Sequence, residues 1–269
     1  MRILISGEGG QGVQIIAEIL ARASEKIGKK VNYMPSFGVE QRGGASIAFL
    51  QINDKPITYP KFSLADIAVA MSNRAIKAIE SRLGQSSLFI FDSSNISEEN
   101  LQSIRSKITK FIALPARDYA NRHLNTRVTN MIFLGALLAH LKDFKVDDLK
   151  SALKEKLKEK TELLEMDLKA IDWGYDFAKS GQGQEFKASL KKEIQKKFED
   201  QQKSWERYPE YCKDCGLCLA RCPAKALIFS NDLNFLGTPM PQVDLAKCTT
   251  CGLCQQVCPD GAIKVTKKE

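Results

Sequence analysis

The eight cysteines near the carboxyl end constrain this chain more than any other feature. They form two copies of the pattern C-x2-C-x2-C-x3-C-P, which together use every cysteine. The runs consist of Cys212, Cys215, Cys218 and Cys222, and of Cys248, Cys251, Cys254 and Cys258. Two-residue spacing lets three thiolates surround one corner of a small inorganic cluster, and zinc sites more often show paired C-x2-C motifs. Disulfides are rare in reducing compartments. The pattern therefore predicts two [4Fe–4S] clusters.

The repeat extends beyond the cysteines, because CGLCLARCPAKALIF parallels CGLCQQVCPDGAIKV. This module resembles the two-cluster ferredoxins, in which the fourth cysteine of each run binds the other cluster. By that rule, cluster 1 uses Cys212, Cys215, Cys218 and Cys258, and cluster 2 uses Cys248, Cys251, Cys254 and Cys222. We expect an α+β ferredoxin-like domain over residues 208–269 that transfers electrons, with a surface hairpin or loop between the runs.

The first part of the chain alternates apolar strands with helices. Strands are expected at Arg2–Ser6, Val31–Met34, Ala45–Ile52, Asp66–Ala70 and Leu88–Asp92, with a helix at Val13–Ile27 and another starting at 95–97. The alternation predicts an α/β fold, a three-layer α/β/α domain with a mostly parallel sheet over 1–182. The run Thr129–Leu141 is apolar almost all round, so we expect a helix buried in the core or in a subunit contact.

A charged helical region begins at Lys142. Apolar residues recur at intervals of three and four from Val146 to Ile171, which predicts amphipathic helices. After SGQGQ at 180–184, a second stripe of Phe186, Leu190, Ile194 and Phe198 predicts a helix that ends near Trp205. We interpret 183–207 as a helical linker, which docks on a partner, joins two modules or packs on its own domain.

The loop GEGGQGV at 7–13 lies between the first strand and the first helix. It has the letters of a dinucleotide-binding fingerprint, but such a site also needs an acid about 20 residues later, and none precedes Glu40. The glycines allow close backbone approach, and the helix start offers free N–H groups to an anion. Arg42, beside Gly43 and Gly44, can bind phosphate or carboxylate, or can belong to a plain turn.

Several motifs together resemble one enzyme family. GEGGQGV, SFGVEQRGG, DIAVA and TNMIFLGALL are similar to the gamma subunit of the 2-oxoacid:ferredoxin oxidoreductases, and the cysteine module resembles their delta subunit. The resemblance implies a gamma–delta fusion in a multi-subunit enzyme. That enzyme decarboxylates a 2-oxoacid on thiamine diphosphate and Mg²⁺ in the alpha and beta subunits. It passes electrons through [4Fe–4S] clusters to ferredoxin and transfers the acyl group to coenzyme A.

The same resemblance implies where coenzyme A binds. Residues near its shared site are Gly7, Gly9, Gly10, Gln11, Gly12, Arg42, Gly43 and Gly44. The alternative interpretation is that these glycines only shape a subunit interface. The loop between the cysteine runs and the ending CPDGAI are more similar to the 2-oxoglutarate branch than to the pyruvate branch.

The chain shows no catalytic residues of its own. No Gly-Asp-Gly motif with an Asn pair is present to hold thiamine diphosphate, and His123 and His140 have no evident acid–base partner. Without an apolar run of about 20 residues or a secretory leader, we expect a cytoplasmic protein with no membrane contact.

One alternative function is that of a self-contained NAD(P)H–ferredoxin oxidoreductase. A redox-sensing nucleic-acid binder is another, but the net charge of +8 is dispersed, so no nucleic-acid partner is expected.

Overall fold

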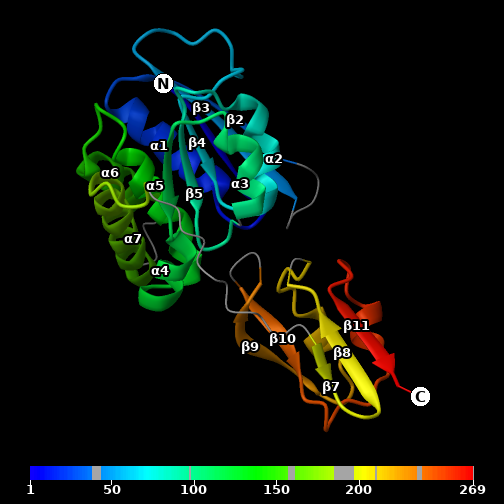
Figure 1. Cartoon of the computed structure of the whole chain (residues 1–269). Coiled ribbons are helices and arrows are strands. Elements are labelled where there is room, and N and C mark those ends of the chain that lie inside the picture. The colour runs from blue at the N-terminus through cyan, green and yellow to red at the C-terminus, as the bar shows by residue number, and fades with distance from the viewer. Residues whose placement is uncertain are drawn as a thin grey trace. The chain divides into compact units, whose positions relative to one another are not determined.

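The computed structural model describes residues 1–37, 44–96, 98–156, 161–184, 197–209, 211–234 and 238–268. The chain folds into two compact units, Met1–Ser189 and Leu190–Glu269, and each is described by itself (Figure 1). No helix in these described parts is long and apolar enough to cross a membrane.

A six-stranded sheet in the order β2-β3-β1-β4-β5-β6 forms the centre of the first unit. Strands β1, β4, β5 and β6 pair in parallel, whereas β3 pairs antiparallel with both β1 and β2. The parallel strands are short apolar runs because both of their faces are covered. The strand bounds are β1 Arg2–Glu8, β2 Lys30–Phe37, β3 Ala45–Asn53, β4 Ile67–Ala70, β5 Leu88–Asp92 and β6 Lys110–Leu114.

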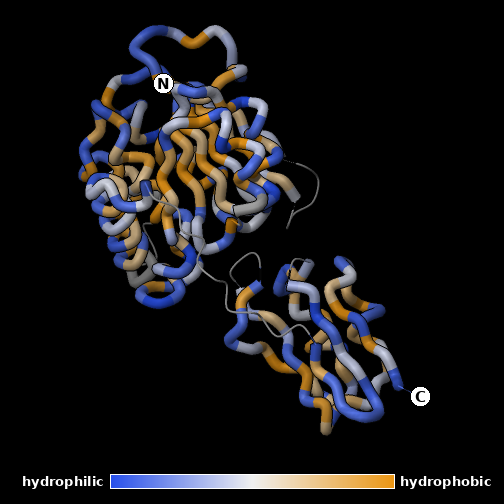
Figure 2. The backbone as a smooth tube through the Cα atoms, viewed as in Figure 1, coloured by the Kyte–Doolittle hydropathy of each residue, from blue (hydrophilic) through white to orange (hydrophobic). Residues whose placement is uncertain are grey.

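Helices cover both faces of this sheet, which confirms the three-layer α/β/α prediction (Figure 1). One face is covered by α1 Val13–Lys26, α4 Ala116–His123, α5 Thr129–Leu138, α6 Val146–Lys156 and α7 Thr161–Lys179. The other is covered by α2 Asn73–Ile79 and α3 Glu98–Arg105. Short 3-10 turns lie at Glu80–Arg82 and Thr126–Val128. Figure 2 shows the apolar strands enclosed by helices whose outer faces are polar.

Helix α5 lies in the core, as its composition predicts, and nine of its ten residues are buried. It packs closely against α7 because each helix presents a glycine to the backbone of the other. A Cβ atom on Gly135 would lie 2.0 Å from the Ile171 carbonyl oxygen, and one on Gly174 would lie 2.1 Å from that of Ile132. Any larger side chain at these positions would force the helices apart.

The second unit contains two small antiparallel sheets. Three strands pair in the order β11-β8-β7, and β9 pairs with β10 as a hairpin, so of the two expected forms, hairpin or loop, the segment between the cysteine runs takes the hairpin. The bounds are β7 Lys197–Glu199, β8 Lys203–Arg207, α8 Leu217–Ala220, β9 Leu227–Leu233, β10 Pro239–Val243, α9 Leu253–Gln256 and β11 Ile263–Lys267.

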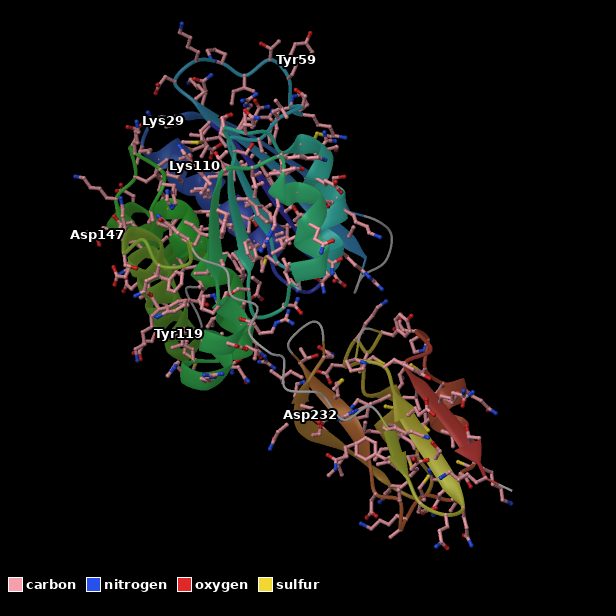
Figure 3. All side chains as sticks on the ribbon, viewed as in Figure 1. Lys29, Tyr59, Lys110, Tyr119, Asp147 and Asp232 are labelled. Atoms are coloured by element: carbon pink, nitrogen blue, oxygen red, sulfur yellow. The ribbon has the colours of Figure 1, made fainter. Side chains whose placement is uncertain are left out.

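Buried Arg207 joins the two sheets of this unit. Its Nη1 donates to the Pro241 carbonyl oxygen at 2.9 Å and to Ser230 Oγ at 3.1 Å, and its Nη2 pairs with Asp232 on β9. Asp232 is labelled in Figure 3. Because a buried guanidinium needs several acceptors, this set ties the hairpin to the larger sheet.

The predicted helix ending near Trp205 is wrong for residues 197–207, which form β7 and β8. Phe198 pairs with Trp205 across this hairpin, and Asp200 Oδ1 accepts from the backbone N–H groups of Gln202 and Lys203 at the turn. Strand β8 also pairs with β11, so a distant partner outweighs the local helical spacing. Phe186, Leu190 and Ile194 lie outside the described residues. The 1–182 and 183–207 boundaries stay predictions, but the last eleven residues of the expected linker are strands and their turn.

Candidate functional site

Four cysteines line each of two separate cavities in the second unit. Cavity 1 is lined by Cys212, Cys215, Cys218 and Cys258. Cavity 2 is lined by Cys222, Cys248, Cys251 and Cys254. Each set contains three cysteines of one run and the fourth of the other, the same grouping that the cross-ligation rule predicts. That these sulfurs bind iron stays a prediction.

The backbone repeats around the two cavities. Asp214 and Thr250 have positive φ directly before the second cysteine of each run, and Gly216 and Gly252 cap the starts of α8 and α9 with φ near +70°. These left-handed residues wrap each run around its cavity.

Backbone N–H groups are aimed at sulfur at the same offset in both runs. The N–H of Ala226 donates to Cys222 Sγ at 3.3 Å, and that of Ala262 donates to Cys258 Sγ at 3.2 Å. Donors of this kind stabilise negative thiolates, so the two halves are built for the same chemistry.

Burial shapes the acid–base behaviour of the thiols. It raises the pKa of Cys218 to about 12, and it also raises the pKa values of Cys212 and Cys254. Thiols with raised pKa values become thiolates when cationic metal binds them. Four cysteines around each cavity, with a backbone N–H donated to one sulfur of each set, therefore fit a [4Fe–4S] cluster in each cavity.

A different side-chain donor lies at each cavity. Trp205, which is 1% exposed, lines cavity 2, and its indole Nε1–H has no acceptor among the described residues by hydrogen-bond geometry. It nevertheless favours the thiolate of Cys254 against the opposing effect of burial. The side chain of buried Asn234 favours the thiolate of Cys212 in cavity 1, and there too burial has the opposite effect and raises the pKa. The cysteine pattern indicates neither residue, because both lie outside the two runs.

The glycine loop of the first unit lies at the carboxyl end of β1. It is closed by Gln11, whose Oε1 accepts from the Glu8 N–H at 2.7 Å and whose Nε2 donates to the Met71 carbonyl at 3.4 Å. The N–H of Gly9 donates to the Gly44 carbonyl at 2.9 Å, so Gly44 lies beside the glycine loop. Arg42 and Gly43 lie outside the described residues.

Two glycines of this loop are in the left-handed region and differ in their surroundings. Gly12 has φ +78°, and a Cβ there would lie 2.4 Å from Asn130 Nδ2. Gly10 has φ +97°, is exposed, and has open space around the Cβ position. Gly7 is enclosed by the Gln11 and Val13 side chains. Helix α1 then begins with no side-chain cap and no acid in its first turn, an arrangement that can hold an anion.

A buried charged pair at the same edge of the sheet was not predicted. Asp92 ends β5, and Arg117 Nε lies 3.9 Å from its Oδ2. Burial raises the pKa of the Asp92 carboxyl, although Arg117 acts in the opposite direction. Glu8 ends β1 and lies 3.8 Å from Arg74. An acid at the carboxyl end of an apolar parallel strand is the signal that sequence reasoning could have used.

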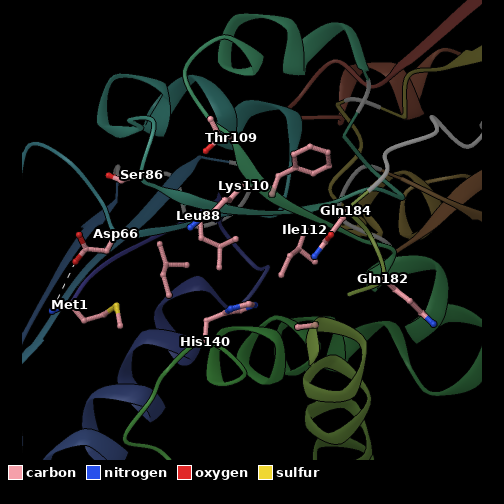
Figure 4. A pocket seen from close by; sticks show the side chains of 13 residues that line it. Met1, Asp66, Ser86, Leu88, Thr109, Lys110, Ile112, His140, Gln182 and Gln184 are labelled. Atoms are coloured by element: carbon pink, nitrogen blue, oxygen red, sulfur yellow. Dashed lines mark ion pairs between the residues drawn. The ribbon is translucent and has the colours of Figure 1, made fainter. Parts of the chain in front are cut away.

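A cavity of about 600 Å³ lies at the opposite edge of the sheet, where β4, β5 and β6 begin (Figure 4). His140 points into it, and burial lowers its pKa. His140 lies just beyond α5 rather than within it, and His123 is exposed at the end of α4 with its ring 4.8 Å from that of Tyr119. Neither histidine lines a cysteine cavity.

Comparisons with known proteins agree with these observations. Residues 2–177 match the model of the pyruvate ferredoxin/flavodoxin oxidoreductase family, and residues 211–262 match that of the 4Fe-4S dicluster domain. The 2-oxoglutarate synthase subunit KorC of Methanothermobacter thermautotrophicus is 33% identical over 182 residues, which cover 66% of this chain and 95% of that protein.

Two further matches are to longer proteins. The ketoisovalerate oxidoreductase subunit VorA of Methanothermobacter thermautotrophicus is 25% identical over 66% of this chain, which spans only 36% of the length of that relative. The structure of a 2-oxoglutarate:ferredoxin oxidoreductase from Magnetococcus marinus, with 2-oxoglutarate, coenzyme A and succinyl-CoA bound, matches with a TM-score of 0.61 and 24% identity. It covers 68% of this chain and 32% of that one. That similarity shows the fold alone.

The fold and the family match define the first unit as a gamma-type domain of the 2-oxoacid:ferredoxin oxidoreductases. The chain therefore belongs to the pyruvate ferredoxin/flavodoxin oxidoreductase family, and it carries a 4Fe-4S dicluster domain behind its gamma-type domain.

Proposed function

We propose that this chain is the combined gamma and delta subunit of a coenzyme A-acylating 2-oxoacid:ferredoxin oxidoreductase. The observation that carries the proposal is the union, in one chain, of the family domain with two four-cysteine cavities. Its partners are thiamine-binding alpha and beta subunits, which perform the decarboxylation, and a ferredoxin or similar acceptor. The chain itself supplies no catalytic residue.

Each cavity holds one cluster in this proposal, and a bound cluster accepts and releases one electron at a time. Cys212, Cys215, Cys218 and Cys258 hold cluster 1, and Cys248, Cys251, Cys254 and Cys222 hold cluster 2. The backbone N–H groups of Ala226 and Ala262 orient one thiolate of each set.

The glycine loop serves coenzyme A in the same proposal. An uncapped helix start and the exposed backbone at Gly10 suit the phosphates of that molecule, and Arg42 and Gly43 follow in the neighbouring loop. The loop between the cysteine runs and the ending CPDGAI favour 2-oxoglutarate as the substrate.

Purification of the native chain with its companion proteins under anaerobic conditions tests this function. Pyruvate, 2-oxoglutarate and 2-oxoisovalerate would each be added, with and without coenzyme A, and reduction of a viologen dye would be followed. We expect 2-oxoglutarate to reduce the dye only in the presence of coenzyme A and the companion subunits. Reduction by NADH or NADPH with the isolated chain would instead favour the self-contained oxidoreductase.

The variants Gly10→Ala and Gly12→Ala separate ligand contact from architecture. Both put alanine in a left-handed conformation, at a cost of about 1 kcal/mol, but only Gly12→Ala also collides with Asn130. If the loop binds coenzyme A, Gly10→Ala raises the KM for coenzyme A several-fold and leaves the KM for the 2-oxoacid unchanged. An unchanged KM for coenzyme A would assign the loop to architecture alone.

A further inference from the structure

Trp205 occupies a fixed position against cavity 2. It lies in the middle of β8, pairs with Val265 on β11 and meets Phe198 edge to face, with ring centroids 5.7 Å apart. Its side chain lines the same cavity as the four cysteines of cluster 2. Packing on both sides therefore leaves the indole little freedom to turn.

The indole N–H of Trp205 is a buried donor that lacks a partner within the described protein. A buried donor with no acceptor costs about 1–3 kcal/mol, so native structures almost always supply one. The residues that line cavity 2 include no charged side chain, and Cys254 packs against the buried apolar cluster that contains Trp205. A cluster-bound thiolate at Cys254 would provide the missing acceptor.

We propose that Trp205 is a positioning residue that donates its Nε1–H to Cys254 Sγ of the bound cluster 2 and thereby raises the reduction potential of that cluster. The proposal rests on the cluster assignment made above. Reduction adds one electron, supplied by the oxidation of the 2-oxoacid, and the negative charge of the cluster and its sulfurs increases. An N–H donated to a cluster sulfur stabilises the reduced cluster more than the oxidised cluster. This stabilisation is strongest in a buried site, where water and ions screen it least.

The hydrogen bond from Trp205 should change the reduction potential of cluster 2 alone, because different residues line cavity 1. Cavity 1 is lined by Lys213, which pairs with Asp260 at 2.5 Å, and by Asp214. Its side-chain donor is Asn234 rather than an indole. Removal of the Trp205 N–H should therefore leave cluster 1 as an internal reference in the same molecule.

A redox titration followed by electron paramagnetic resonance tests this proposal on the full chain in its complex. In Trp205→Phe, which keeps an aromatic ring but loses the N–H, one of the two midpoint potentials should become more negative while the other stays unchanged. Phe198→Leu is the matched control, because it disturbs the same packing without removing a donor, and it should move neither potential. Two unchanged potentials in Trp205→Phe, or equal shifts in both variants, would overturn the proposal.

A measurement on the wild-type protein covers the case in which Trp205→Phe fails to fold. The chain contains two tryptophans, and Trp173 lies on α7 in the first unit. With ¹⁵N-indole-labelled tryptophan, electron–nuclear double resonance should detect nitrogen coupled to one reduced cluster. An absence of this coupling contradicts the hydrogen bond even if coenzyme A-dependent turnover is intact, whereas loss of turnover with the coupling present counts only against the proposed function.

Discussion

The first unit buries apolar side chains on both faces of a six-stranded sheet, whereas the second buries few and surrounds its two cavities with cysteines. The buried core of the second unit includes Phe198, Trp205, Leu227, Val243 and Ile263, and cysteines pack directly against it. Small domains with so little apolar burial usually depend on metals or disulfides. The comparison indicates that the first unit is stable by packing and the second by its clusters.

Removal of iron should have the largest effect, because it should unfold the second unit and leave the first unit folded. Anaerobic chelation of the full chain should abolish hydrogen-exchange protection in β8 to β11, because metal binding and folding are coupled in such domains. Strands β1, β4 and β5 should keep their protection. Persistent protection of the second unit without iron would contradict the dependence on clusters.

A larger side chain between α5 and α7 offers the opposite test, because it should destabilise only the first unit. Gly135→Ala should lower the free energy of unfolding of that unit by about 3 kcal/mol, because the new Cβ meets the Ile171 backbone. Gly84→Ala, whose nearest neighbour is 3.7 Å away, is the control and should change it by less than about 0.5 kcal/mol. Chemical denaturation followed by far-UV circular dichroism, which reports mainly on the long helices of the first unit, would measure both changes, and equal effects would show that α5 and α7 can separate without cost.

A smaller effect is expected from buried Asp167 on α7, whose pKa is raised to about 6 by burial. The folded state binds the proton more tightly than the unfolded state, so stability is lost as the pH rises from about 4 through 6. Asp167→Asn should remove this loss and stabilise the first unit by up to about 2 kcal/mol at pH 7, after allowance for screening. Thermal unfolding of the wild-type protein and of Asp167→Asn between pH 4 and 7 measures this difference in stability. A difference that does not change with pH would contradict titration of Asp167 as its cause.

The sequence predicted those parts of the molecule whose signal is local. The apolar strands and α5 are recognisable from composition and the two cysteine runs from their spacing, whereas the grouping of the eight cysteines came from the resemblance to two-cluster ferredoxins. Strand β6 was not predicted, although it is as long as β5, which was. The helix expected up to Trp205 failed because pairing with β11 determines that segment.

The parts of the site that were missed depend on contacts between distant residues. Asp92 and Arg117 come together only because α4, which was not predicted, follows β6 at the carboxyl edge of the sheet. Trp205 reaches cavity 2 only because β8 is a strand. No local pattern could indicate that its side chain lines the same cavity as three cysteines of the second run.

The cluster assignment itself is tested most directly by metal analysis combined with one variant. Anaerobically prepared chain should contain about eight iron and eight sulfide. Cys222→Ala should then perturb the signal of cluster 2, whose other ligands come from the second run, and leave cluster 1 intact. Zinc without iron, or a change in Cys222→Ala confined to cluster 1, would contradict this account.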